Sequence, residues 1–90
     1  MAERPEARAQ LVRLIGLEID PGPALAAAVD ARFDLLLDGI TAELTASDDV
    51  FDRESARAFL ASRLAFLGDL LTPAQRSRLS DSLEKRIEAW

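Results

Sequence analysis

Leu71-Thr72-Pro73-Ala74-Gln75 is the clearest helix start in this 90-residue chain. A threonine hydroxyl caps a helix well, and proline suits the first helical position because its missing N–H has no partner there anyway. Glutamine three residues after the cap can reach back to the backbone N–H of the cap residue. The stretch therefore predicts a capping box that begins a helix at Pro73, with Leu71 buried ahead of it.

On either side of this start, apolar residues recur at the period of an α-helix. The final segment, residues 72–90, has a narrow stripe that covers one neighbour: Leu79, Leu83, Ile87 and Trp90. The segment before it, residues 51–71, has a wider face: Ala56, Phe59, Leu60, Leu64, Phe66, Leu67, Leu70 and Leu71. Asp52 is the expected N-cap of that helix, and Phe51 is expected to fold back on Ala56 as a hydrophobic staple.

Ile19-Asp20-Pro21-Gly22-Pro23 resembles the later start in its order of aliphatic residue, capping side chain and proline. It predicts a buried Ile19, with Asp20 capping and Pro21 opening a long helix over residues 20–45. The stripe of that helix is Leu25, Val29, Phe33, Leu36, Ile40 and Leu44. Gly39 inside it indicates a bend or a close approach. An N-terminal helix over residues 1–16 ends at Gly16.

These segments predict one all-α domain of four helices. The long helices 20–45 and 51–71 are expected to form an antiparallel hairpin flanked by the two shorter ones. A chain of 90 residues arranged in this way leaves apolar surface uncovered, and we therefore expect a homodimer.

Composition argues against catalysis. The chain has no Cys and no His, which excludes disulfides, Cys/His metal sites and histidine-based catalysis. Its serines have no base to activate them, so we expect no enzyme activity and no cofactor. The acidic turn at Asp48 and Asp49 does not match a calcium loop, because Val50 and Phe51 occupy ligand positions. A solvated turn explains it better, and a hard cation there is left open.

The charge of the chain is unevenly distributed. A net charge of −5 argues against nucleic acid as a partner, since binding phosphates requires a basic surface. Residues 30–54 hold eight acidic residues against two arginines, whereas residues 55–78 hold four arginines against Asp69. Such a division favours pairing between the two segments or between two copies. The simpler interpretation is that the two sets are solvated helix faces.

No stretch has the roughly 20 apolar residues that a membrane span requires. Residues 1–5 contain no apolar signal core. We therefore expect either a cytoplasmic protein that begins at Met1 or an exported domain without its export segment.

The five residues from Leu71 to Gln75 resemble the LTxxQ motif of the Spy/CpxP group of bacterial periplasmic proteins, which is related to metal-resistance proteins such as ZraP and CnrX. The run Phe51-Asp52-Arg53, followed by an Ala/Arg/Leu-rich helix, is also similar to that group. The resemblance implies a bent helical hairpin, often dimerised into a cradle, that serves as an ATP-independent chaperone, an envelope-stress regulator or a metal sensor.

In that group the LTxxQ residues are structural, so Leu71, Thr72 and Gln75 are carried over as hinge-fixing positions with no catalytic role. Three features depart from the pattern. The chain has no His or Cys ligands for metal sensing, it is acidic where Spy-like cradles tend to be basic, and it shows no export signal.

Two functions follow as expectations. The first is a Spy/CpxP-like protein that holds unfolded clients or a sensor domain on an apolar face. The residues expected at that face or interface are Phe59, Leu60, Leu64, Phe66, Leu67 and Trp90. The second is a cytosolic helical adaptor whose same face is closed by a partner or a second copy. The expected structural motif positions are Asp20, Pro21, Leu71, Thr72, Pro73 and Gln75.

Overall fold

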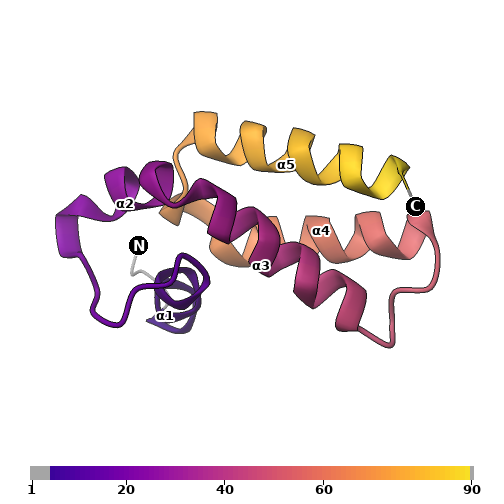
Figure 1. Cartoon of the computed structure of the whole chain (residues 1–90), viewed down its shortest axis with the longest axis horizontal. Coiled ribbons are helices and arrows are strands. Elements are labelled where there is room, and N and C mark those ends of the chain that lie inside the picture. Colours follow the sequence, from indigo (N-terminus) through magenta and orange to yellow (C-terminus); the bar gives the residue numbers. More distant parts are fainter. Residues whose placement is uncertain (1–4, 90) are drawn as a thin grey trace.

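The computed structural model describes residues 5–89, which form five α-helices (Figure 1). They are α1 (Pro5–Leu14), α2 (Leu25–Ala31), α3 (Phe33–Ala46), α4 (Arg53–Leu67) and α5 (Pro73–Glu88), with short 3-10 turns at Gly22–Ala24 and Gly68–Leu70. The predicted all-α class is confirmed, but the helices number five and not four. Trp90 lies outside the described residues.

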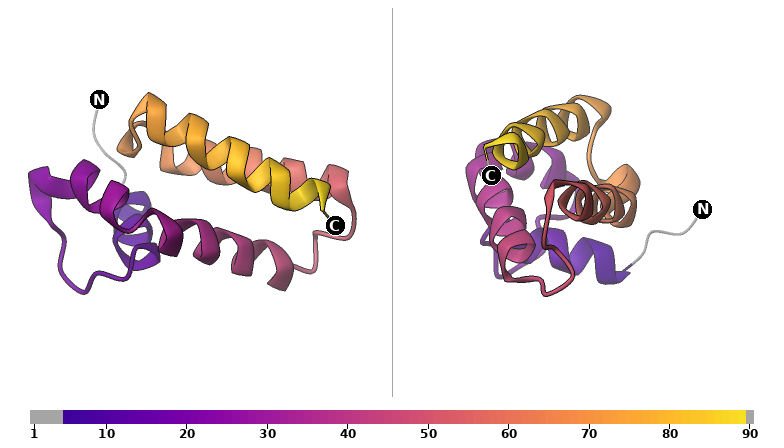
Figure 2. Two further views of the ribbon diagram at one scale, coloured as in Figure 1. Left: turned by 45° about the horizontal axis from the view of Figure 1, so that its top comes forward. Right: turned by 90° about the vertical axis from the view of Figure 1, so that its right-hand side faces the viewer.

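The helices are arranged as a bundle of α3, α4 and α5 that α1 crosses at one end. Figure 1 shows α1 almost end-on while the other three run along the long axis, and the right-hand view of Figure 2 shows the reverse. The most extensive helix pair is α4 with α5. The predicted hairpin, which paired the helices before and after the acidic turn, is therefore not the dominant contact of the fold.

The long helix predicted over residues 20–45 is interrupted at Arg32. The backbone of Arg32 is not helical, with φ −121° and ψ 28°, and α3 runs in a different direction from α2 (Figure 1). The Arg32 N–H is shared between the carbonyls of Ala28 and Val29, and its guanidinium donates to the Ile15 carbonyl at 3.4 Å. A hydrogen bond to Ile15, the residue that follows α1, therefore accompanies a break that contains neither Gly nor Pro.

The start of that helix also differs from the prediction. Asp20 does not cap α2: its carboxylate accepts from the Gly22 N–H at 2.7 Å and from Arg8, and regular α-helix begins only at Leu25. Gly22 has a φ of 64°, a left-handed backbone conformation that does not occur inside an α-helix, so no α-helix begins at Pro21. Ile19, expected to be buried, is 82% exposed.

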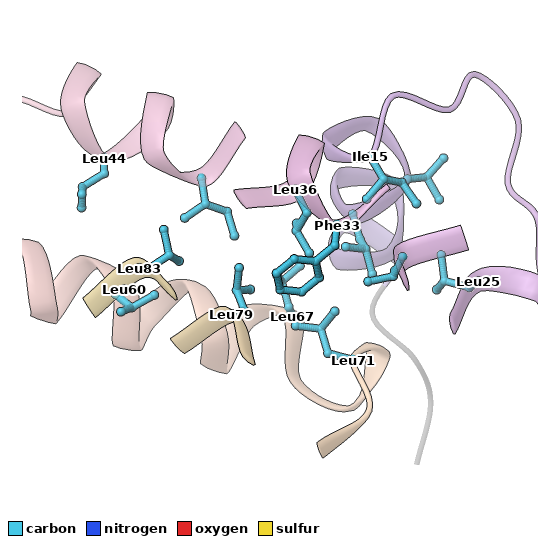
Figure 3. Close-up of a cluster of buried hydrophobic side chains, with 14 of the residues drawn as sticks. Ile15, Leu25, Phe33, Leu36, Leu44, Leu60, Leu67, Leu71, Leu79 and Leu83 are labelled. Carbon is cyan, nitrogen blue, oxygen red and sulfur yellow. The ribbon is translucent and has the colours of Figure 1, made fainter. Parts of the chain in front are cut away.

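The core forms where the predicted stripes meet (Figure 3). Each of the five helices contributes fully buried apolar side chains, and the predicted stripes of α3 and α5 are confirmed over their described residues. The largest side chains that are fully buried are Leu11, Ile15, Val29, Leu36, Ile40, Leu67, Leu71, Leu79, Leu83 and Ile87. One copy therefore closes its own core. Within residues 5–89 the exposed large apolar side chains are Ile19, Leu35 and Phe51, and they do not form the broad uncovered face from which a homodimer was expected.

Gly39 marks the close approach of two helices, as expected. A Cβ atom placed there would lie 2.8 Å from Leu14 Cδ2, so the missing side chain lets α1 cross directly over α3. α3 continues through Gly39 without a break. Of the two alternatives raised by this glycine, the close approach is the one that occurs.

Candidate interaction surface

Gln75 joins α5 to α2 at a corner of the fold. Its Oε1 accepts from the Thr72 N–H at 3.0 Å while the Thr72 hydroxyl accepts from the Gln75 N–H at 3.1 Å, which confirms the predicted capping box. Its Nε2 also donates to the Ala26 carbonyl at 2.8 Å and to Asp30 at 2.9 Å. Among residues 5–89 Gln75 is the one buried polar residue, and its side-chain hydrogen bonds hold α2 and the start of α5 in place. In this fold the motif therefore has a structural role.

The apolar face predicted on α4 is mostly enclosed. Leu60 and Leu67, expected at a binding surface, are 5% and 1% exposed and belong to the core. Phe59, Leu64 and Phe66 are half-buried and pack against the same core. The physical reason is that α5 and α1 cover α4 within one copy.

Arg63 fills the space between the two half-buried rings of α4. Its guanidinium lies 5.3 Å from the ring centre of Phe59 and 5.9 Å from that of Phe66, distances at which a cation and an aromatic face attract. It also donates to Gln10 of α1 at 3.2 Å and pairs with Glu43 of α3 at 3.4 Å. Arg63 therefore ties α4 to both neighbours and reduces the apolar area that this face offers.

A shallow pocket of about 230 Å³ lies beside this network, lined by Gln10, Arg13, Leu14 and Glu43. One oxygen of Glu43 is buried there without a hydrogen bond, since the Arg63 ion pair is not aligned for one. The lining holds no nucleophile beside a base. Within residues 5–89 no group of three or more acidic side chains is placed to hold a metal ion. The pocket has no evident chemistry of its own.

Charge pairing joins elements inside the chain. Of the predicted pairing between residues 30–54 and 55–78, the ion pair Arg63–Glu43 is present, and Arg78 lies over the Phe33 ring at 4.1 Å. Other arginines use partners elsewhere, as in Arg57–Glu84 and Arg86–Asp38. The basic residues of α4 and α5 are thus largely committed within one copy.

The turn between α3 and α4 is fixed by side chains at both ends. The Ser47 hydroxyl accepts from the Asp49 N–H at 3.3 Å. At the start of α4, Asp52 and Ser55 form a capping box, and the Ser55 hydroxyl accepts from the N–H groups of Phe51 and Asp52, both at 3.0 Å. Asp52 is confirmed as the N-cap. Hydrogen bonds from the backbone and hydroxyl of Ser55 lower the pKa of the Asp52 carboxyl, so it is ionised at neutral pH.

Phe51 projects from this turn into solvent. Its side chain is 81% exposed, so it does not fold back on Ala56, which is fully buried. The predicted staple is wrong because Val50, the residue before it, takes the place against the core. Four acidic residues and one arginine surround Phe51 in the sequence, and all five are exposed: Asp48, Asp49, Asp52, Arg53 and Glu54. An exposed aromatic ring thus lies in a segment whose charge is mostly negative.

Phe51 is the feature that sequence reasoning misplaced. A phenylalanine within a run of aspartates could have indicated an exposed ring. Its position directly before the N-cap Asp52 favoured the hydrophobic staple instead. The structure does not bring Phe51 together with the predicted face of α4, because that face turns inward.

Comparison with protein-family models, with curated proteins and with solved structures found no match to this chain. The resemblance to the Spy/CpxP group therefore stays a prediction. Within residues 5–89 none of the helices combines the length and the apolar character needed to cross a bilayer.

Proposed function

We propose that this chain is a non-enzymatic helical adaptor that binds a protein partner through its outer surface. The observation that supports this most is Phe51, which is 81% exposed on a turn whose backbone is held by Asp52 and Ser55. Single exposed apolar residues are ordinary on a protein surface. This one differs because its backbone is fixed and because the other described phenylalanines contact the core.

A closed core favours an adaptor over a holder of unfolded clients. A holder needs a broad apolar surface that adapts to many sequences. Here Leu60 and Leu67 are buried, and Arg63 lies between Phe59 and Phe66. The large apolar side chains that remain exposed within residues 5–89 are Ile19, Leu35 and Phe51, which belong to different elements and suit one partner better than many clients.

The runner-up is the Spy/CpxP-like chaperone, together with the periplasmic location that the resemblance implies. The capping box of Thr72 and Gln75 favours it, since that motif is the basis of the resemblance. It requires helices that separate to expose α4. No other feature of the described residues supports it.

Two assays separate these functions. In cells that make the protein, a photo-cross-linking amino acid is placed at Phe51, Ala31 or Ser77, which lie at exposed positions of different elements. An adaptor gives one discrete cross-linked product at one or more positions, whereas a client holder gives a broad ladder. The purified chain is then added in molar excess to a denatured model substrate. We expect no suppression of aggregation, and strong suppression would replace the adaptor with the chaperone.

A further inference from the structure

We propose that the α3–α4 turn docks through Phe51 into an apolar pocket of a different protein, and that Lys or Arg side chains form the rim of that pocket. This inference rests on the adaptor function proposed above and names the partner by its chemistry.

The ring supplies the apolar half of the contact. Transferring a phenylalanine side chain from water into an apolar pocket is favourable, and this chain leaves that gain unused by keeping Phe51 81% exposed. The capping box and the Ser55 hydroxyl already order the backbone at Phe51 and Asp52, so little freedom is lost when the turn docks. An exposed aromatic anchor on an ordered backbone is the usual form of an interface hot spot.

The acidic residues near Phe51 indicate which side chains surround the partner's apolar pocket. Docking Phe51 brings exposed acidic residues near it in the sequence close to the partner surface, namely Asp48, Asp49 and Glu54, against the single basic residue Arg53. An uncharged rim would strip water from these carboxylates without replacing its hydrogen bonds. A basic rim replaces those bonds, speeds association and rejects acidic surfaces.

A second copy of this chain does not fit as the partner. The chain carries a net charge of −5, so two copies repel. Five of the six arginines on α4 and α5 are engaged internally by Glu84, Glu43, Asp69, Asp38 and the Phe33 ring. The one pocket described above already contains Glu43, which would face the acidic turn. A separate basic protein is the better match.

A defined probe with the same chemistry tests the contact. β-Cyclodextrin that carries an amino group on every glucose unit is an apolar cavity with a cationic rim, and the parent β-cyclodextrin has a neutral rim. Each is titrated into the labelled full chain while backbone amide shifts are recorded. We expect shifts centred on the α3–α4 turn and binding of the cationic probe about tenfold tighter at low salt, a difference that salt screening reduces. Equal affinity of the two probes, or shifts centred elsewhere, would overturn the proposal.

Variants separate the ring from the charges. Phe51→Ala is expected to abolish binding of both probes, while the double variant Asp48→Asn/Asp49→Asn keeps binding of the neutral probe and loses much of the preference for the cationic one. Ile19→Ala is the matched control, because Ile19 is 82% exposed on another loop. It should leave both titrations unchanged. Loss of binding in Ile19→Ala, or retained binding in Phe51→Ala, would contradict the assignment.

The cross-linking experiment carries the test to the natural partner. We expect the product from position 51 to map to an apolar pocket rimmed by Lys or Arg. A partner captured only from position 31 or 77, whose binding survives Phe51→Ala, overturns this inference and leaves the adaptor function standing. No discrete product from any position overturns both.

Discussion

Gln75 and Asp30 lie 45 residues apart in sequence, yet Gln75 Nε2 donates to the Asp30 carboxylate at 2.9 Å. The same nitrogen donates to the Ala26 carbonyl, while Oε1 accepts from Thr72. One side-chain amide thus accepts the hydrogen bond of the Thr72 N–H at the start of α5 and also binds α2 to α5. A motif that looks like a local helix start is also a long-range cross-link, which explains why this side chain is buried.

Replacing Gln75 tests that cross-link. Gln75→Ala removes the capping bond to Thr72 and both bonds to α2, all of them part-buried, and losing these three hydrogen bonds together costs about 1–3 kcal/mol. We therefore expect the free energy of unfolding, measured in urea, to fall by an amount in that range. Thr72→Ser keeps a capping hydroxyl and is the control, with a much smaller effect. A Gln75→Ala variant as stable as the parent would show that the corner is held by apolar packing alone.

Acid should weaken the loop before α2. The hydrogen bonds from Arg8, together with the one from the Gly22 N–H, lower the pKa of Asp20 from 3.8 to about 2. A depressed pKa in the folded state means that the stabilisation is complete above the unfolded value and is lost as the pH falls. The difference in unfolding midpoint between the parent and Asp20→Asn should therefore be constant above about pH 4 and shrink between pH 4 and 2. A difference that grows on acidification would contradict the ion pair.

The crossing of α1 over α3 depends on Gly39. Alanine there gains up to about 1 kcal/mol of helix propensity and requires only a shift of the flexible end of Leu14, so Gly39→Ala should be nearly neutral. Gly39→Val adds branched bulk to the contact, and overpacking of this kind costs about 1–3 kcal/mol. Unfolding in urea distinguishes the two. If both variants are equally stable, the two helices are not in close contact at this point.

Core and surface apolar residues should respond oppositely to truncation. Leu67 is 1% exposed and Phe51 is 81% exposed. Leu67→Ala should lower the free energy of unfolding by about 2–5 kcal/mol, because it leaves a cavity. Phe51→Ala should change it by no more than about 0.5 kcal/mol, as is usual for surface substitutions. A large loss in Phe51→Ala would mean that the ring is packed and is not available to a partner.

Local signals in the sequence predicted the helix class, the caps at Asp52 and Thr72, and the stripes of α3 and α5. They failed where contacts distant in sequence decide the outcome. The break at Arg32 has no Gly or Pro to announce it, and the four-residue step from Val29 to Phe33 continues across it. Whether the face of α4 turns inward depends on how α1 and α5 pack. Phe51 was misplaced for a similar reason, because the choice between a staple and an exposed ring depends on whether Val50 reaches the core.

Fluorescence of a dye that reports exposed apolar surface is the most direct test that the apolar stripes of this chain close within one copy. Added to the native protein at neutral pH and low concentration, the dye should stay near its signal in buffer and brighten only when acid or urea loosens the packing. Strong fluorescence from the native state would mean that the stripes are open to solvent, and the adaptor proposal would then be contradicted.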